Sequence, residues 1–249
     1  MQKETSSLRI PFIFRLTEVF DHTSTVRELI LSSENNSLLS FKSGQFVMLH
    51  VPQTDGKPVL RAYSIASSDQ DNTRFHLLFK YIPNGIASEY VWHLKGQELL
   101  SFTGPFGKLL FKEPPTQQMI FLNTGTGLAQ HYSYLISNLG KYPKHQFRML
   151  FGLPNPKEIY YKKELENLST VYPNFKYDFV FSDPSSSPTM NTSETLKTGY
   201  LQDQLENFKY LETPTTFYLC GNRSMLCSVR DQLQESGFNK ENILCEAFD

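Results

Sequence analysis

The 249-residue chain has few cysteines, and their number excludes several kinds of site. Cys220, Cys227 and Cys245 fit neither a disulfide framework nor a zinc site. A plant-type iron–sulfur cluster needs four closely spaced thiolates, so three separated cysteines cannot hold one. Free thiols are typical of a reducing cytoplasm, and we expect the protein there.

Long apolar runs and basic runs are also missing. No stretch approaches about 18 consecutive apolar residues, so we expect no membrane span. The segment Met1–Arg9 is polar and lacks the apolar stretch of a signal peptide. The formal net charge is −1 and no Lys/Arg-rich run occurs, so we expect no nucleic-acid partner.

What is present is typical of a globular protein. Hydrophobic residues make up 39% of the chain and charged residues 20%, which allows a substantial core. At roughly 150 residues per domain, this length indicates two domains or one large one. The 20 Phe and 13 Tyr suit a stacked ring ligand, although core packing is the more common reason for so many rings.

The first part of the chain, residues 1–115, has the pattern of strands. Five segments rich in β-branched and aromatic residues are predicted strands: Ile10–Phe20, Thr25–Ser32, Gln45–Val51, Leu60–Ala66 and Arg74–Ile82. A short helix fits Ile86–Leu94. Strands at such short spacing predict a barrel or a sandwich, and Pro114-Pro115 is interpreted as a linker after it.

In the second part, residues 116–249, strands alternate with helices. We expect strands at Met119–Leu122, Phe147–Phe151, Phe175–Phe181, Phe217–Cys220 and Ile243–Ala247. We expect helices up to Leu139 and over Glu158–Leu168, Gly199–Phe208 and Ser224–Ser236. This alternation predicts a parallel sheet with helices on both faces.

Two motifs in the first part could bind a cofactor. In Arg61-Ala62-Tyr63-Ser64, arginine can hold a pyrophosphate, tyrosine can stack on a ring and serine can donate to a ring nitrogen. Taken alone, the motif is better interpreted as an ordinary strand. In Gly85-Ile86-Ala87-Ser88, small residues at a helix start can approach an anion. An ordinary cap by Asn84 explains that segment equally well.

The second part offers three further motifs. Asn123-Thr124-Gly125-Thr126-Gly127-Leu128 is either a nucleotide-phosphate turn or a tight strand–helix turn, and it lacks the third glycine of the Rossmann fingerprint. Cys220-Gly221, followed by Met225, ends a strand at the edge where ligands bind, although a lone cysteine is more often a small core residue. Glu246-Ala247-Phe248 would be functional only if the terminus is docked.

The succession of these elements resembles the ferredoxin–NADP reductase superfamily, most closely its plant-type members, over nearly the whole length. The resemblance is carried by R-A-Y-S-I-A-S-S at 61–68, G-P-F-G-K at 104–108, T-G-T-G-L-A at 124–129, the segment 151–161, Y-L-Q-D at 200–203, C-G at 220–221 and E-A-F at 246–248. It implies a six-stranded antiparallel Greek-key barrel that holds FAD, followed by a Rossmann-like NAD(P)-binding domain.

The resemblance also implies roles for single residues. Arg61 and the backbone of Gly85, Ile86, Ala87 and Ser88 would bind the FAD pyrophosphate. Tyr63 would stack on the isoalloxazine, with Ala62 beside it in the motif and Ser64 at N5. Phe248 would cover the flavin face and move aside for nicotinamide.

For the second domain, the resemblance implies a site for NADH or NADPH. Thr124, Gly125, Thr126 and Gly127 would cradle the nucleotide, Tyr200 would meet adenine, and Cys220, with Gly221 and Met225, would position the nicotinamide. Ser64, Cys220 and Glu246 would then surround the hydride path.

The sequence departs from the family pattern at three places. Gln130 replaces a proline, which allows a looser helix start, and Phe248 followed by Asp249 replaces a terminal tyrosine. Asp183 and Thr198 stand where NADP-dependent members carry cations. An aspartate repels a 2′-phosphate and accepts from a free ribose hydroxyl, so we expect a preference for NADH. The alternative is that the nearby Lys197 compensates for the missing cations.

We therefore expect an oxidoreductase that passes electrons from a nicotinamide nucleotide through FAD to a separate acceptor protein, such as a ferredoxin, a flavodoxin or an oxygenase component. Two alternatives stay open. A flavin reductase has a similar barrel but uses flavin as a substrate, and a non-catalytic electron-transfer component of a larger complex would show no diaphorase activity.

Overall fold

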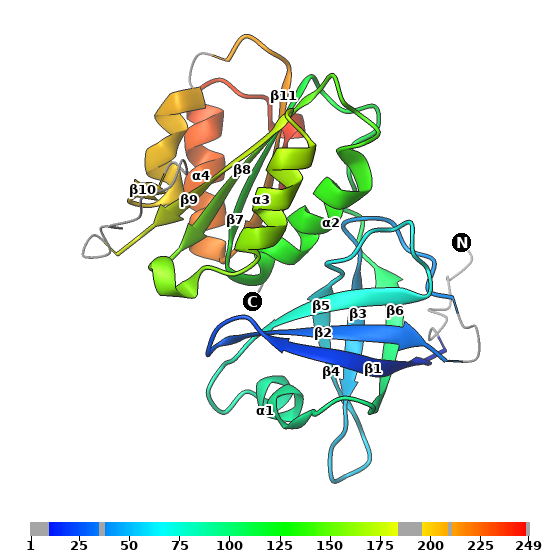
Figure 1. Cartoon of the computed structure of the whole chain (residues 1–249). Coiled ribbons are helices and arrows are strands. Elements are labelled where there is room, and N and C mark those ends of the chain that lie inside the picture. Colours follow the sequence, from blue (N-terminus) through cyan, green and yellow to red (C-terminus); the bar gives the residue numbers. More distant parts are fainter. Residues whose placement is uncertain (1–9, 35–37, 184–195, 209–210, 248–249) are drawn as a thin grey trace, which may run out of the picture.

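The computed structural model describes residues 10–34, 38–183, 196–208 and 211–247. They form an antiparallel sheet and a parallel sheet that follow each other along the chain (Figure 1). In the part of the chain described, no helix is both long enough and apolar enough to cross a membrane.

The antiparallel sheet has the strand order β4-β3-β6-β1-β2-β5. Its strands are β1 Phe12–Asp21, β2 Val26–Ser33, β3 Phe46–Val51, β4 Val59–Ser64, β5 Arg74–Lys80 and β6 Leu99–Phe106. The two ends of this order approach each other at an isolated antiparallel bridge between Ile65 and Leu77. The bridge closes the sheet into the expected six-stranded barrel.

The barrel forms because apolar side chains alternate along its strands. In β3, Val47, Leu49 and Val51 are buried, while the residues between them are partly exposed. Alternation with a period of two directs one face of a strand into the core. The helix α1, Ile86–His93, contributes Ala87 and Val91 to the same core.

The parallel sheet has the strand order β10-β9-β8-β7-β11-β12. Its strands are β7 Gln118–Thr124, β8 Gln146–Leu153, β9 Phe175–Phe181, β10 Leu196–Thr198, β11 Thr215–Gly221 and β12 Ile243–Ala247. The helices are α2 Leu128–Asn138, α3 Lys162–Val171 and α4 Arg223–Glu235. Short 3₁₀ turns are η1 Gly125–Gly127, η2 Pro156–Glu158, η3 Leu201–Phe208 and η4 Lys240–Asn242.

Both faces of this sheet are covered, as its apolar strands require. In β7, Met119 and Phe121 belong to the core cluster that includes residues of α2 and α3. Ile120 and Leu122, between and after them, belong to the opposite cluster with residues of α4 and η3. The expected fold of a barrel followed by a Rossmann-like domain is confirmed.

Several boundaries differ from the sequence-based expectation. The segment expected to be a helix from Gly199 to Phe208 is the 3₁₀ turn η3, and β6 and β10 were not anticipated as strands. The helix expected from Glu158 begins at Lys162, because Pro156–Glu158 forms a 3₁₀ turn and Tyr161 has a left-handed φ of 57°. A boundary near residue 115 stays a proposal, since Phe111 already stacks on Phe147 and Tyr218.

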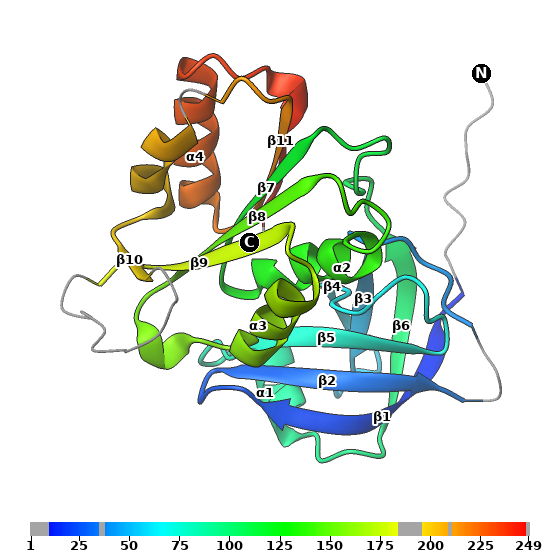
Figure 2. The same cartoon turned by 45° about the horizontal axis from the view of Figure 1, so that its top comes forward.

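One face of α2 docks onto the barrel through polar side chains, and α2 lies between the two sheets (Figures 1 and 2). Ser133 Oγ donates to the Ser67 carbonyl over 2.7 Å, and Gln130 Nε2 donates to the Gly44 carbonyl over 3.2 Å. Ser137 Oγ accepts from the Asp69 N–H over 3.2 Å. Residues 130, 133 and 137 share one helix face because they are three and four positions apart.

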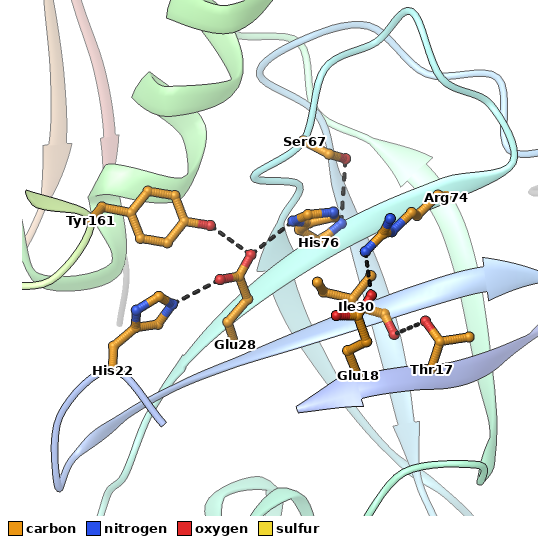
Figure 3. A network of polar contacts seen from close by, with 9 residues as sticks. All are labelled: Thr17, Glu18, His22, Glu28, Ile30, Ser67, Arg74, His76 and Tyr161. Atoms are coloured by element: carbon orange, nitrogen blue, oxygen red, sulfur yellow. Dashed lines mark hydrogen bonds and ion pairs between the residues drawn. The ribbon is translucent and has the colours of Figure 1, made fainter. Parts of the chain in front are cut away.

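A second contact between the two parts centres on Glu28 of β2 (Figure 3). Its buried carboxylate accepts a hydrogen bond from Tyr161 Oη at 2.7 Å, and it pairs with His22 Nε2 at 2.7 Å and His76 Nδ1 at 2.8 Å. Burial raises the pKa of Glu28, but these three hydrogen bonds outweigh burial and lower the pKa to about 2. The ionised carboxylate therefore joins α3's leading turn to the barrel.

We predict that Glu28→Gln destabilises the protein by about 2–3 kcal/mol at neutral pH, because three donors lose an ionised acceptor. The folded pKa of about 2 lies below the ordinary 4.5, so this contribution is complete above pH 4.5 and is lost as pH falls toward 2. Urea unfolding at pH 7, 4 and 3 measures it. Glu18→Gln, at an exposed pair with Arg74, is the control. If the difference in free energy of unfolding between the parent and Glu28→Gln does not change with pH, the destabilisation comes from packing and not from the ionised carboxylate.

Candidate active site

A cavity of about 790 Å³ lies at the carboxyl edge of the parallel sheet. Its walls come from the ends of β7, β8, β9 and β11 and from the segments that follow them. The barrel supplies the opposite wall through residues 80–83, at the end of β5. One cavity is therefore shared by both parts of the chain.

The cavity lies at the point where the order in which the chain adds strands to the sheet reverses. From β7 the chain adds β8, β9 and β10 on one side, and then returns to place β11 on the other side of β7. In open α/β sheets, ligands bind in the crevice outside such a switch point. Thr124 and Gly221, at the ends of β7 and β11, both line this cavity.

Two glycines allow the loops at this crevice to touch. A Cβ on Gly221 would lie 2.2 Å from Thr124 Oγ1, and a Cβ on Gly127 would lie 2.4 Å from the Cys220 carbonyl oxygen. Thr124 Oγ1 accepts hydrogen bonds from the Asn222 N–H and Nδ2, each over 3.3 Å. The glycine turn and the β11 loop are thus held as one unit.

Gly125 differs from these two glycines because its Cβ would meet nothing within 4 Å. It lies between Thr124 and Thr126, and all three line the cavity at the entry to α2. Backbone N–H groups at the start of a helix favour an anion. The open space at Gly125 fits a dinucleotide phosphate.

Of the residues expected near adenosine, Tyr200 lines the cavity and Asp183 does not. Tyr200 is 58% exposed and lines the cavity, and its N–H donates to Asp203 Oδ2 over 2.7 Å. Asp183 follows Ser182, which lines the cavity, and its N–H donates to the Pro154 carbonyl over 3.0 Å. Lys197 forms an ion pair with Asp178 at 3.1 Å.

Cys220 and Glu246 stand opposite each other in the register of β11 and β12. Cys220 is fully buried and does not itself line the cavity, unlike Gly221 and Met225, which follow it. Burial raises the pKa of the Cys220 thiol well above its ordinary value, and nearby Glu246 raises it further. Burial raises the pKa of Glu246 above its ordinary value, and a hydrogen bond from Gln130 partly offsets this rise.

Two buried polar side chains stabilise the turn behind Cys220. His131 Nδ1 lies 3.2 Å from Asn123 Oδ1, and Asn123 is the neighbour of Cys220 in the sheet. Complete burial lowers the pKa of His131 to about 3, so its ring is neutral and donates to the amide oxygen. The pair orients Asn123 immediately before the glycine turn.

The motif Arg61-Ala62-Tyr63-Ser64 occupies the end of β4. Arg61 is exposed, and its guanidinium donates to the neighbouring Leu60 carbonyl over 3.0 Å. Tyr63 is half-buried with its ring 4.1 Å from that of Phe79, and burial raises its pKa to about 12. Ala62 is exposed and Ser64 is buried. An exposed arginine and a supported aromatic ring fit a flavin dinucleotide.

Gly85, and not Asn84, is the N-cap of α1, and no side-chain hydrogen bond caps this helix. Ile86 is 45% exposed at the first position, whereas Ala87 is buried. Ser88 Oγ accepts from the Ile82 N–H over 3.0 Å and donates to the Lys80 carbonyl over 3.4 Å. A phosphate would therefore meet backbone N–H groups and not this hydroxyl.

Six of the predicted residues line this cavity: Thr124, Gly125, Thr126, Tyr200, Gly221 and Met225. Gly127, Asp183, Cys220, Glu246 and the described residues predicted to hold FAD do not line it. Ser64 is buried and does not line the cavity, and the N–H of its neighbour Ile65 donates to the Gln45 carbonyl over 3.0 Å. Phe248 lies outside the described residues. Sequence reasoning did not assign Lys80, Tyr81 or Tyr160 to the site, and they carry no motif that could have indicated it.

Two family models match consecutive parts of the chain. Residues 14–111 match a family described as an oxidoreductase FAD-binding domain. Residues 121–231 match a family described as an oxidoreductase NAD-binding domain.

Curated relatives cover the same region. A component of the Na(+)-translocating NADH-quinone reductase of Neisseria gonorrhoeae is 29% identical over 206 residues, which are 77% of this chain and 50% of the relative. The corresponding component from Haemophilus influenzae is 30% identical over 76% of this chain and 48% of the relative. The chain spans about half the length of these relatives.

Solved structures share the fold. The cytochrome P450 reductase of Amycolatopsis has a TM-score of 0.82 and 21% identity, covering 98% of this chain and 73% of that one. A ferredoxin NADP⁺ reductase of Neisseria gonorrhoeae, solved with FAD and NADP, has a TM-score of 0.80 and 21% identity, covering 95% and 98%.

We predict that Gly221→Ala lowers the free energy of unfolding by about 1–3 kcal/mol, because its Cβ would collide with Thr124 Oγ1 at a φ of +151°. Gly125→Ala is the matched control: its φ is +49° with open space around it, so only about 1 kcal/mol of backbone strain is expected. Urea unfolding of both variants compares them. Equal losses would show that the Thr124 contact does not limit this position.

Proposed function

Because this chain belongs to the ferredoxin–NADP reductase superfamily of FAD- and NAD(P)-dependent oxidoreductases, we propose that it oxidises NADH at the shared cavity and passes the electrons to a separate protein acceptor. The cavity lined by both parts of the chain is the observation that carries this proposal. A ring held by the barrel and a ring held by the parallel sheet could meet only where the two parts share a wall.

The barrel residues would hold FAD, which when bound supplies a ring that accepts a hydride and releases electrons singly. Arg61 would contact the pyrophosphate through its exposed guanidinium, and the uncapped start of α1 would add the N–H groups of residues 86–88. Tyr63, supported by Phe79, would stack on the ring system. Ser64 would donate to a ring nitrogen.

The parallel sheet would hold the nicotinamide nucleotide. The backbone of Thr124–Gly127 would bind its phosphates and Tyr200 its adenine. Gly221 and Met225 line the inner end of the cavity, with Cys220 buried directly behind them. Cys220 and Glu246 would shape the nicotinamide pocket and exclude water from the path between the two rings.

The acceptor is proposed to be a one-electron carrier, such as a ferredoxin, a flavodoxin or an oxygenase component. The relatives are named as subunits of an NADH-quinone reductase, which supports transfer to another protein component and supports NADH as the donor. The same name gives weight to the alternative that the chain works as part of a larger complex. Reduction of an artificial acceptor by the isolated chain would separate a catalytic unit from a non-catalytic component.

We predict that the purified chain is yellow and that NADH bleaches its flavin absorption. Arg61→Ala is expected to weaken FAD retention about 10- to 100-fold, because a charge-assisted contact contributes about 1.5–3 kcal/mol. Arg74→Ala, which removes an arginine paired with Glu18 on the same barrel, should retain FAD as the parent does. FAD content after dialysis measures this. A colourless parent that reduces added flavin would instead indicate a flavin reductase.

We further predict that kcat/KM is higher for NADH than for NADPH. Asp183 would repel the extra phosphate, and Lys197 is held by Asp178 instead of being directed at the ribose. Water at the cavity mouth reduces the repulsion, so a preference of about tenfold is expected. Asp183→Arg should move the ratio toward NADPH. A parent that favours NADPH, or a variant with an unchanged ratio, would remove Asp183 from the nucleotide site.

A further inference from the structure

Gln130 connects the carboxyl-terminal strand to the barrel. It lies in the first turn of α2 and is fully buried. Its Nε2 donates to Glu246 Oε2 over 2.6 Å and to the Gly44 carbonyl over 3.2 Å. A proline, which the superfamily pattern has at this position, could make neither bond. The looser helix start expected from this replacement stays a prediction, and α2 begins at Leu128.

The orientation of this amide follows from its two partners. A backbone carbonyl can only accept, and an ionised carboxylate can only accept, so both must face the amide NH₂ group. The Gln130 Oε1 atom is then directed away from Glu246, and it has no hydrogen-bond partner within the described ranges. Gln130 therefore donates to Glu246, and this bond is stronger when the carboxylate is ionised than when it is protonated.

The groups around the Glu246 carboxylate leave the Gln130 amide as its hydrogen-bond donor. Cys220 on β11 and Tyr134 on α2 are the titratable side chains that face the carboxylate from neighbouring elements, and Cys245 precedes it on β12. Burial keeps all three neutral by raising their pKa values. Among the residues that the structure describes, no lysine or arginine pairs with Glu246, so a neutral amide is its hydrogen-bond donor.

We propose that Gln130 is a positioning residue that keeps the Glu246 carboxylate ionised and fixed against the flavin-binding barrel beside the hydride path, an inference that rests on the proposed function. The contact makes the position of Glu246 depend on how α2 docks to the barrel. The nicotinamide pocket and the flavin-binding part are thereby aligned through one side chain.

A control variant on the same face of α2 distinguishes an effect on Glu246 from a purely structural role of Gln130. Gln130→Met keeps the side-chain length but removes both donors, and Gln130→Pro restores the superfamily residue without a donor. Ser133→Ala removes the adjacent bond from α2 to the barrel, at the Ser67 carbonyl, and does not touch Glu246. Circular dichroism establishes that each variant is folded.

The test is a titration of Glu246 by carbon-13 NMR of protein labelled at the glutamate carboxyls, with Glu246→Gln to assign the resonance. We expect the apparent pKa of Glu246 to rise in both Gln130 variants and to stay at the parental value in Ser133→Ala. Flavin reduction by NADH, followed by stopped flow at neutral pH, should slow about tenfold in Gln130→Met. The apparent pKa in the dependence of this rate on pH should also be higher than in the parent.

An unchanged Glu246 titration in both Gln130 variants, or an equal shift in Ser133→Ala, would overturn the inference. A parent that holds FAD but is not reduced by NADH would instead overturn the proposed function. The NMR titration needs no turnover, so the two failures are distinguishable.

Discussion

The docking of α2 onto the barrel is the contact on which the site depends. The barrel and the parallel sheet each have a core cluster of their own, and a third apolar cluster joins Val26, Ala66 and Leu78 of the barrel part to residues of α2, α3 and the parallel sheet. The polar face of α2 and the Glu28 carboxylate fix how they meet. Polar contacts suit this task because hydrogen bonds require particular distances and directions, whereas apolar packing tolerates sliding.

The two contacts are joined through the barrel. His76, which pairs with Glu28, donates its backbone N–H to Ser67 Oγ over 3.3 Å, and the Ser67 carbonyl accepts from Ser133 of α2. Hydrogen bonds therefore link α3's leading turn to α2, and Gln130 links α2 to Glu246. The nucleotide cavity lies beside this path, with Lys80 and Tyr160 in its walls.

Much of the fold was predictable because it depends on local pattern. Strand β9 at Phe175–Phe181 and strand β12 at Ile243–Ala247 were predicted with the observed bounds. Strand β6 escaped because Gly104-Pro105 within it is typical of a turn. The spacing of Leu201, Leu205 and Phe208 fits an α-helix as well as the 3₁₀ turn that forms. The contact of Gln130 with Glu246 could not be predicted from local pattern, since the two residues are 116 positions apart in the chain.

The burial of Cys220 has a consequence for the durability of the protein. Peroxides and alkylating compounds react with a thiolate and only slowly with a thiol. Because burial raises the pKa of Cys220 well above its ordinary value, the sulfur stays protonated in neutral solution. A soft, polarisable atom can thus lie directly behind Gly221, at the inner side of the cavity wall, without itself being consumed by oxidants.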